Sequence, residues 1–188
     1  MKNAVLISIQ PKWCRMIKQG KKTVEVRKTY PKAPDLPRPF KCYIYCTKEK
    51  WHLLEILKDG TEIYGTTYHG KPAFIKTPST EYMSTYEQGC VIGEFDCETI
   101  ESLVRFNRLP DAEPEYCQPL LGSTCLTDSE LAVYGSKKPL YGWLIKNLII
   151  YPSPVPLASM GLKRPPQSWC YVEQNDELKQ KGGVKLDV

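Results

Sequence analysis

Three charged residues close together in the sequence could bind an anionic ligand: Lys22, Glu25 and Arg27. Glu25 and Arg27 are two positions apart, so in an extended strand they share one face, and the tight turn Gly20-Lys21-Lys22 brings Lys22 beside them. The two cations keep the carboxylate ionised, because nearby positive charge favours its charged form. Such a group can contact a phosphate through Lys22 and Arg27 while Glu25 accepts a hydrogen bond from an amine of a base.

Aromatic side chains near this group could stack a base. Trp13 lies on the helix expected just before the turn, and Tyr45 lies on the next expected strand. Ring faces interleaved with cations are what unpaired nucleic acid requires, since bases offer faces and backbones offer charge. We therefore expect a ligand-binding surface with further cations, namely Lys12 beside Trp13 and the pair Lys163 and Arg164 at the rim of that surface.

Simpler interpretations compete with this one. Glu25 and Arg27 could form a solvent-facing ion pair on a strand, which is common and usually worth little. The eight cysteines do not indicate zinc, because Cys42 and Cys46, four positions apart on an expected strand, are too distant to share one ion. The two histidines complete no ligand spacing. We predict buried thiols, no metal site and no cofactor.

The elements that must position the charged group lie in the first 47 residues. Ala4–Ile9 is a short apolar run typical of a strand buried on both faces. Pro11–Gln19 is expected to be a helix, with proline at its first position and Gly20 after its end. Thr23–Lys28 alternates as a strand does, and Phe40–Thr47 predicts another, with Tyr45 on the face opposite its cysteines.

The rest of the chain is less regular. Sixteen prolines indicate long ordered loops. We expect a short helix over Trp51–Gly60, a strand over Cys90–Ile100, a helix capped by Thr127 or Asp128 and ended by Gly135, and a strand over Tyr141–Tyr151. The stretches 52–88 and 104–125 are expected to be insertions or long loops. We predict one α+β domain over residues 1–173, a small mixed β-barrel with flanking short helices, and a flexible polar tail over 174–188.

Composition and charge narrow the classes of protein. The 188 residues carry 26 basic and 21 acidic side chains, a net charge of +5. Residues 12–50 hold 12 basic and three acidic residues, so the positive charge gathers around the proposed group. No apolar run is long enough to cross a bilayer, and Ala4–Ile9 is too short for a signal-peptide core. We expect a cytoplasmic protein with reduced cysteines and no membrane partner.

Gly20-Lys21-Lys22-Thr23-Val24-Glu25-Val26-Arg27 resembles the Gly-x-Lys-x-x-Glu-x-Arg motif of ASCH domains, which belong to the PUA-like superfamily. The opening strand and helix fit the same family, as does the strand Val91-Ile92-Gly93-Glu94-Phe95. The closing run from Gly161 to Val172 resembles small ASCH proteins of phages and prophages. The resemblance implies a small β-barrel with a cleft between barrel and helix, the motif on its floor, and an RNA ligand.

The resemblance also bears on activity. Some small ASCH proteins are amidohydrolases that deacetylate N4-acetylcytidine, and some are credited with ribonuclease activity. In the deacetylases the motif lysine is catalytic and a threonine stands in place of the motif glutamate. Lys22 matches that lysine, but Glu25 occupies the threonine position, so the deacetylase activity is not carried over.

Three hypotheses remain. The first is a non-enzymatic module that binds single-stranded RNA or a nucleotide through the residues above. The second is a hydrolase acting on a modified nucleoside or on RNA, with Glu25 as general base and Lys22 stabilising an oxyanion. The third is a phage protein that interferes with host defence by binding a nucleotide or a protein. The sequence does not indicate the ligand or the oligomeric state.

Overall fold

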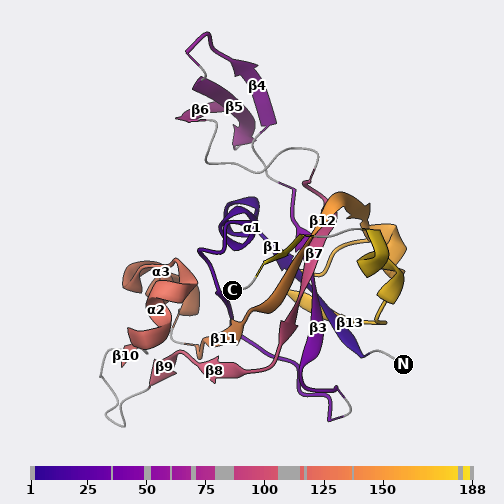
Figure 1. Cartoon of the computed structure of the whole chain (residues 1–188). Coiled ribbons are helices and arrows are strands. Elements are labelled where there is room, and N and C mark those ends of the chain that lie inside the picture. The colour runs from indigo at the N-terminus through magenta and orange to yellow at the C-terminus, as the bar shows by residue number, and fades with distance from the viewer. Residues whose placement is uncertain are drawn as a thin grey trace.

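A six-stranded sheet forms the body of the molecule (Figure 1). The computed structural model describes residues 3–34, 36–48, 52–59, 61–68, 71–78, 87–105, 115–116, 118–136, 138–181 and 184–186. The strands lie in the order β13-β1-β3-β7-β12-β14. They are β1 (Ala4–Ile9), β3 (Phe40–Cys46), β7 (Cys90–Cys97), β12 (Lys146–Pro156), β13 (Trp169–Val172) and β14 (Val184–Leu186). β1 and β3 are parallel, and each other neighbouring pair is antiparallel.

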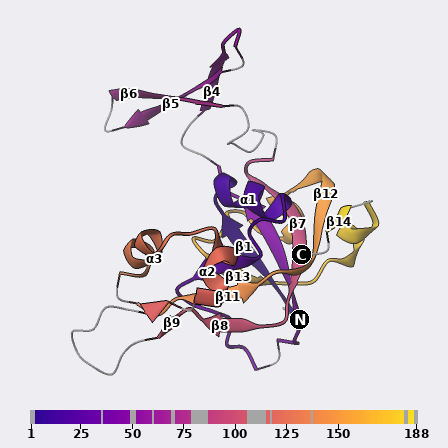
Figure 2. The same cartoon turned by 60° about the vertical axis from the view of Figure 1, so that its left-hand side comes forward.

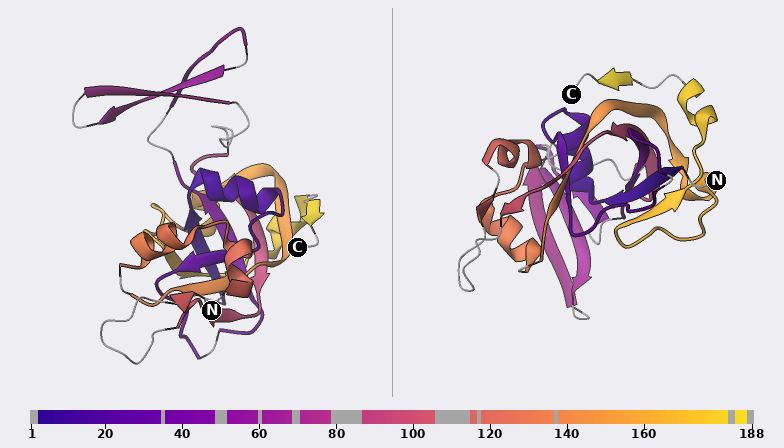
Figure 3. Two further views of the ribbon diagram at one scale, coloured as in Figure 1. Left: turned by 90° about the vertical axis from the view of Figure 1, so that its left-hand side faces the viewer. Right: turned by 90° about the horizontal axis from the view of Figure 1, so that it is seen from below.

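Both faces of this sheet are covered, which is why every residue of β1 is buried. On one face, a first core packs under helix α1 (Pro11–Lys18) and includes Ile7, Ile44 and Trp143. On the other face, a second core includes Tyr43, Tyr45, Tyr151 and Leu178 of the 3-10 helix η2 (Asp176–Lys181). Seen from below, the strands curve around the interior (Figure 3).

A smaller sheet carries the charged group and lies beside the main one (Figures 1 and 2). Its order is β2-β11-β8, and its strands are β2 (Val24–Arg27), β11 (Tyr141–Leu144) and β8 (Ile100–Ser102). A third core of Val26, Leu103, Leu131 and Leu140 joins this sheet to helices α2 (Gln118–Thr124) and α3 (Asp128–Gly135). The short strands β9 (Val104–Arg105) and β10 (Glu115–Tyr116) pair with each other.

The expected helix and turn before β2 are confirmed. Pro11 begins α1, where its missing N–H leaves no helix bond unmade, and Cys14 and Ile17 form its buried face. Gly20 has a φ of 69°, a left-handed conformation that favours glycine, and it lets the chain reverse into β2. The backbone N–H groups of Lys21 and Lys22 both donate to the carbonyl of Met16, at 3.0 and 3.1 Å.

The expected cap of the later helix is also confirmed. Thr127 Oγ1 accepts from the backbone N–H of Glu130 at 3.2 Å, and the Glu130 carboxylate accepts from the Thr127 N–H at 2.8 Å. This reciprocal capping box satisfies two backbone donors at the start of α3. Ser136, in the left-handed conformation, ends the helix after Gly135.

Two expectations for the middle of the chain are wrong. The helix predicted over Trp51–Gly60 is instead the strand β4 (His52–Ile56), which pairs with β5 (Thr61–Tyr68), itself paired with β6 (Lys71–Pro78). These three strands form a sheet of their own within the stretch expected to be an insertion or long loop. The predicted loop 104–125 contains α2, whose Gly and Ser are poor helix formers and whose leucines pack against the third core.

The C-terminal part is more ordered than expected. The strand predicted over Tyr141–Tyr151 is two strands, since β11 pairs with β2 and β12 crosses to pair with β7. The 3-10 helix η1 (Leu157–Met160) follows β12 directly. Instead of a flexible tail from residue 174, η2 buries Leu178 in the second core and β14 pairs with β12. The burial of Leu178 and the pairing of β14 are contacts that the polar composition of this segment does not indicate.

The α+β class is confirmed, with sheets and short helices in separate parts of the fold. Strand pairing among the described residues leaves β13 and β14 as the two edges of the main sheet. The main sheet is therefore a curved, open sheet by its hydrogen bonds. Among the described residues no pairing of β13 with β14 closes it into the expected barrel. None of the helices in the described part of the chain has the length and apolar character needed to span a bilayer.

Candidate functional site

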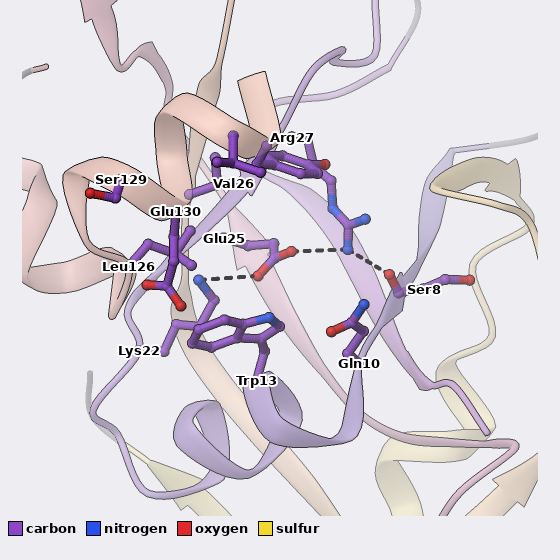
Figure 4. A pocket seen from close by; sticks show the side chains of 12 residues that line it. Ser8, Gln10, Trp13, Lys22, Glu25, Val26, Arg27, Leu126, Ser129 and Glu130 are labelled. Atoms are coloured by element: carbon purple, nitrogen blue, oxygen red, sulfur yellow. Dashed lines mark hydrogen bonds and ion pairs between the residues drawn. The ribbon is translucent and has the colours of Figure 1, made fainter. Parts of the chain in front are cut away.

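A cavity of about 510 Å³ lies where α1, β2, α3 and the end of β1 meet (Figure 4). That volume falls in the range of small-molecule sites. Its lining residues are Ser8, Gln10, Trp13, Lys22, Glu25, Val26, Arg27, Leu126, Ser129, Glu130, Val133 and Tyr134. Lys22, Glu25 and Arg27, predicted from their spacing, therefore converge on one concave surface, which we call the motif pocket.

The pocket floor is a buried cluster of three charges. Lys22, Glu25 and Arg27 are only 2, 5 and 8% exposed. An Arg27 guanidinium nitrogen donates to Glu25 Oε1 at 2.9 Å, and Lys22 Nζ lies 3.4 Å from Oε2 (Figure 4). The interpretation as a solvent-facing ion pair is therefore wrong, because the pair is desolvated on the floor of a cavity.

Backbone carbonyls hold the two cations in place. Lys22 Nζ donates to the Thr124 carbonyl at 2.7 Å, at the C-terminal end of α2. Arg27 donates to the Ser8 carbonyl at 2.5 Å, near the end of β1. Two buried side-chain atoms of this cluster have no hydrogen-bond partner among the described residues: Glu25 Oε2 and Arg27 Nε. A buried carboxylate oxygen without a donor is costly in a native fold, and a ligand that donates to it would remove that cost.

The pocket walls are aromatic and apolar. Trp13 of α1 forms one wall, with Lys22 Nζ 5.2 Å and Lys12 Nζ 4.5 Å from its ring centroid. Val133 and Tyr134 of α3 form the other wall, and they are 80 and 38% exposed. Burial raises the pKa of the Tyr134 hydroxyl, against the opposing effect of the nearby Arg27 guanidinium. The walls therefore offer faces on which a flat ring could stack.

Some predicted residues do not line the motif pocket. Tyr45 points to the opposite face of β3 and packs in the second core, 4% exposed. Lys163 and Arg164 are exposed on the loop after η1 and are not among the lining residues. That loop still touches the site indirectly, because Ser8 Oγ donates to the Pro166 carbonyl at 2.7 Å. Lys12 is exposed over Trp13, outside the lining set.

Sequence reasoning missed the wall formed by α3. The relevant pattern is visible in the sequence: Leu131 and Gly135 mark the buried face of this helix, so Val133 falls on the outer face and Tyr134 at the flank of the buried one. An apolar and an aromatic residue on an exposed helix face, next to the motif turn in space, identify a wall. Ser8 was missed because β1 reads only as a core strand, and Gln10 because it reads only as the junction between that strand and α1.

The described residues contain no group of three or more His, Cys, Asp or Glu side chains that could hold a metal ion. Cys14, Cys42, Cys46 and Cys97 are buried as free thiols around the first core. Burial raises the pKa of Cys14 and of Cys42 well above the ordinary value. These two thiols are therefore held in the protonated, unreactive form.

The fold and the pocket define a class: a mixed α+β domain with a curved sheet, short flanking helices and a charged cavity between them. A family model described as the ASCH domain matches residues 7–149, more than half of the chain. The chain belongs to the ASCH domain family. No curated protein matches the chain.

Solved structures of an ASCH protein from Zymomonas mobilis share the fold. Its crystal structure is 19% identical over 96% of this chain and 94% of that chain, with a TM-score of 0.55. A single-residue mutant of that protein is 18% identical over 95% of both chains, with a TM-score of 0.53. At this identity the likeness shows the fold alone, and the resemblance to phage proteins stays a prediction.

Proposed function

We propose that the motif pocket binds one base of single-stranded RNA or of a nucleotide. The observation that carries this proposal is the buried Glu25 Oε2, which has no hydrogen-bond donor among the described residues although it lies on the floor of an open cavity. A carboxylate oxygen in that position accepts from an amine or ring N–H on a base edge. Family membership supports the proposal, because ASCH domains are PUA-like modules generally associated with RNA.

Each part of the pocket has a role in this proposal. The Lys22 ammonium donates one N–H to the Thr124 carbonyl and lies 3.4 Å from Glu25 Oε2 as an ion pair. A further N–H of the ammonium can donate to a ring nitrogen or carbonyl beside the amine of the base. Arg27 holds the carboxylate in place through Oε1. Trp13 stacks the base, the interaction that single-stranded binders use most. A base edge that carries a hydrogen-bond donor next to an acceptor therefore fits the floor, with its donor on Glu25 and its acceptor on Lys22.

The same floor could support hydrolysis, and one observation favours keeping that second candidate. Lys22 Nζ and Glu25 Oε2 lie 3.4 Å apart in a cavity large enough for a nucleoside and a water molecule. In this alternative, Glu25 takes a proton from water while Lys22 stabilises the oxyanion that develops on an acyl or phosphoryl group. Binding without turnover separates the first candidate from the second.

Calorimetric titration with ribonucleosides and short single-stranded RNAs tests the proposal. We expect Trp13→Ala to weaken binding by about 1–3 kcal/mol, the usual effect of removing one stacking ring. Val133→Glu places a negative charge on the pocket wall without disturbing the core, since Val133 is 80% exposed, and should weaken anionic ligands. Ala132→Glu, exposed on the same helix but not lining the pocket, is the matched control.

Two outcomes would reject the proposal. If no nucleoside, nucleotide or RNA binds at millimolar concentration, the pocket has another ligand. If Ala132→Glu weakens binding as much as Val133→Glu, the ligand binds elsewhere on α3. Product analysis of N4-acylated cytidines and labelled RNA, compared between wild type and Glu25→Gln, decides between binding and hydrolysis.

A further inference from the structure

The buried cations on the pocket floor are already committed to partners within the protein. Arg27 donates both to Glu25 and to the Ser8 carbonyl, and Lys22 contacts Glu25 and the Thr124 carbonyl. Two cations and one carboxylate leave the floor with a single net positive charge. Bringing a phosphate to it would require desolvating a strongly hydrated anion against a carboxylate. The floor therefore suits a neutral base better than a phosphate.

Two further cations lie over the aromatic rings of the pocket walls. Lys12 Nζ lies 4.5 Å from the ring centroid of Trp13, and Lys28 Nζ lies 4.9 Å from that of Tyr134. Lys12 is exposed and Lys28 is half-buried. Each lysine thus sits on one of the two aromatic walls and keeps its charge near water, where an ammonium is least costly to hold.

Lys12 reaches toward the opposite wall of the pocket. Hydrogen bonds from Thr127 lower the pKa of Glu130, a lining residue of α3, and the charge of Lys12 acts in the same direction as a smaller cause. The Glu130 carboxylate accepts hydrogen bonds from Thr127, so it caps α3, and within the described part of the chain it forms no ion pair with Lys12. The Lys12 ammonium therefore lies over the Trp13 wall and is not paired with the Glu130 carboxylate.

From this arrangement, and on the basis of the proposed function, we propose that Lys12 and Lys28 are the phosphate-binding residues of the site. The pocket takes the base of an internal nucleotide of a single strand, and the phosphates before and after that nucleotide each meet one of the two lysines. A base turned into a pocket leaves its backbone at the mouth, with one phosphate on each side. Two cations on two opposed walls match that backbone, whereas a free nucleoside engages neither.

The salt dependence of binding separates the phosphate contacts from the contacts of the base. Dissociation constants would be determined from low to moderate NaCl for the four ribonucleosides and for RNA pentamers with each base at the centre. We expect pentamer binding to weaken with salt, and nucleoside binding to be nearly independent of it. Each phosphate contact on a single strand contributes about 0.7 to the slope of log K against log salt, so Lys12→Gln and Lys28→Gln should each remove about that much.

The control variant is Lys32→Gln. Lys32 is also an exposed lysine over an aromatic ring, 5.4 Å from the centroid of Tyr30, but neither residue lines the motif pocket. It should leave the slope at its wild-type value. Nucleoside affinity should be unchanged in Lys12→Gln and Lys28→Gln, which also shows that both variants are folded.

The outcomes separate the two proposals. If pentamers and nucleosides bind and the salt slopes of Lys12→Gln and Lys28→Gln equal that of the wild type, the phosphate assignment is wrong. The proposal that the pocket binds a base would be unaffected. Free nucleotides could instead bind as tightly as the pentamers, with the salt slope reduced in only one of Lys12→Gln and Lys28→Gln. That result would overturn the internal-nucleotide assignment in favour of a free nucleotide. Absence of binding by every ligand would overturn both the pocket and its rim.

Discussion

Arg27 and Glu25, two positions apart on β2, form a buried ion pair at 2.9 Å that uses only one of the two carboxylate oxygens. The other oxygen lies 3.4 Å from Lys22 and has no hydrogen-bond partner in the described part of the chain. The pair therefore does two things. It holds the carboxylate in a fixed orientation, and it leaves an acceptor without a hydrogen bond on a residue that lines the cavity.

This relationship predicts a strong effect on stability. Glu25→Gln removes the negative charge between two buried cations, and breaking a buried pair in this way typically costs about 3–5 kcal/mol. We expect the free energy of unfolding, measured by urea denaturation, to fall by that order. Glu101→Gln, an exposed carboxylate on β8 in the same sheet, is the control and should change it by less than about 0.5 kcal/mol. Equal effects would mean that the floor is not a coupled cluster.

The cap of α3 is expected to matter for the pocket wall. Thr127→Ala removes the side chain that accepts from the Glu130 N–H, and loss of such a cap costs about 1 kcal/mol. Hydrogen bonds from Thr127 lower the pKa of Glu130, so the cap stabilises the fold fully above the ordinary carboxyl pKa and is lost as the pH falls through the lowered value. In urea denaturation, the difference in free energy of unfolding between wild type and Thr127→Ala should be smaller in strong acid than at neutral pH. A constant difference would contradict this role.

Alkaline pH should destabilise the second core. Burial raises the pKa of Tyr43 to about 12, whereas an unfolded tyrosine titrates near 10. Between these values the unfolded chain loses the proton and the folded chain keeps it, so stability that is complete below pH 10 falls as the pH rises. Tyr43→Phe should reduce the loss between pH 9 and pH 12 by about 1–2 kcal/mol. Part of the loss should remain, because burial also raises the pKa of Tyr151; an unchanged loss would contradict the assignment.

The close approach of β7 and β12 explains why position 93 of β7 is a glycine. A Cβ on Gly93 would lie 2.4 Å from the Ile149 carbonyl oxygen, which is backbone and cannot move aside. We expect Gly93→Ala to destabilise the protein by about 1–3 kcal/mol through overpacking, seen as a lower urea midpoint. Gly122→Ala on α2 has nothing within 4 Å of its new Cβ and should be neutral or stabilising. Similar losses in both variants would be inconsistent with this explanation.

Local chemistry made several features predictable from the sequence. Pro11 and Gly20 mark the ends of α1, Thr127 caps α3, and the alternation of β2 brings Glu25 and Arg27 to one face. Each of these depends on contacts between residues a few positions apart. The convergence of the motif on one concave surface was expected, but its burial was not, since alternation alone does not show what covers a face.

Contacts between segments distant in the sequence determined the other features of the site, namely its walls and the position of Tyr45. Tyr45 alternates away from the motif, and only the packing of the second core shows that it cannot stack a ligand in the motif pocket. The α3 wall, contributed more than 100 residues after Trp13, packs against β2 through the third core, and the end of α2 just before it is bonded to Lys22 through the Thr124 carbonyl. The sequence by itself determined the charged floor, because its geometry follows from one turn and one strand. Only the tertiary structure determined the walls, because burial free energy is a property of which distant surfaces meet.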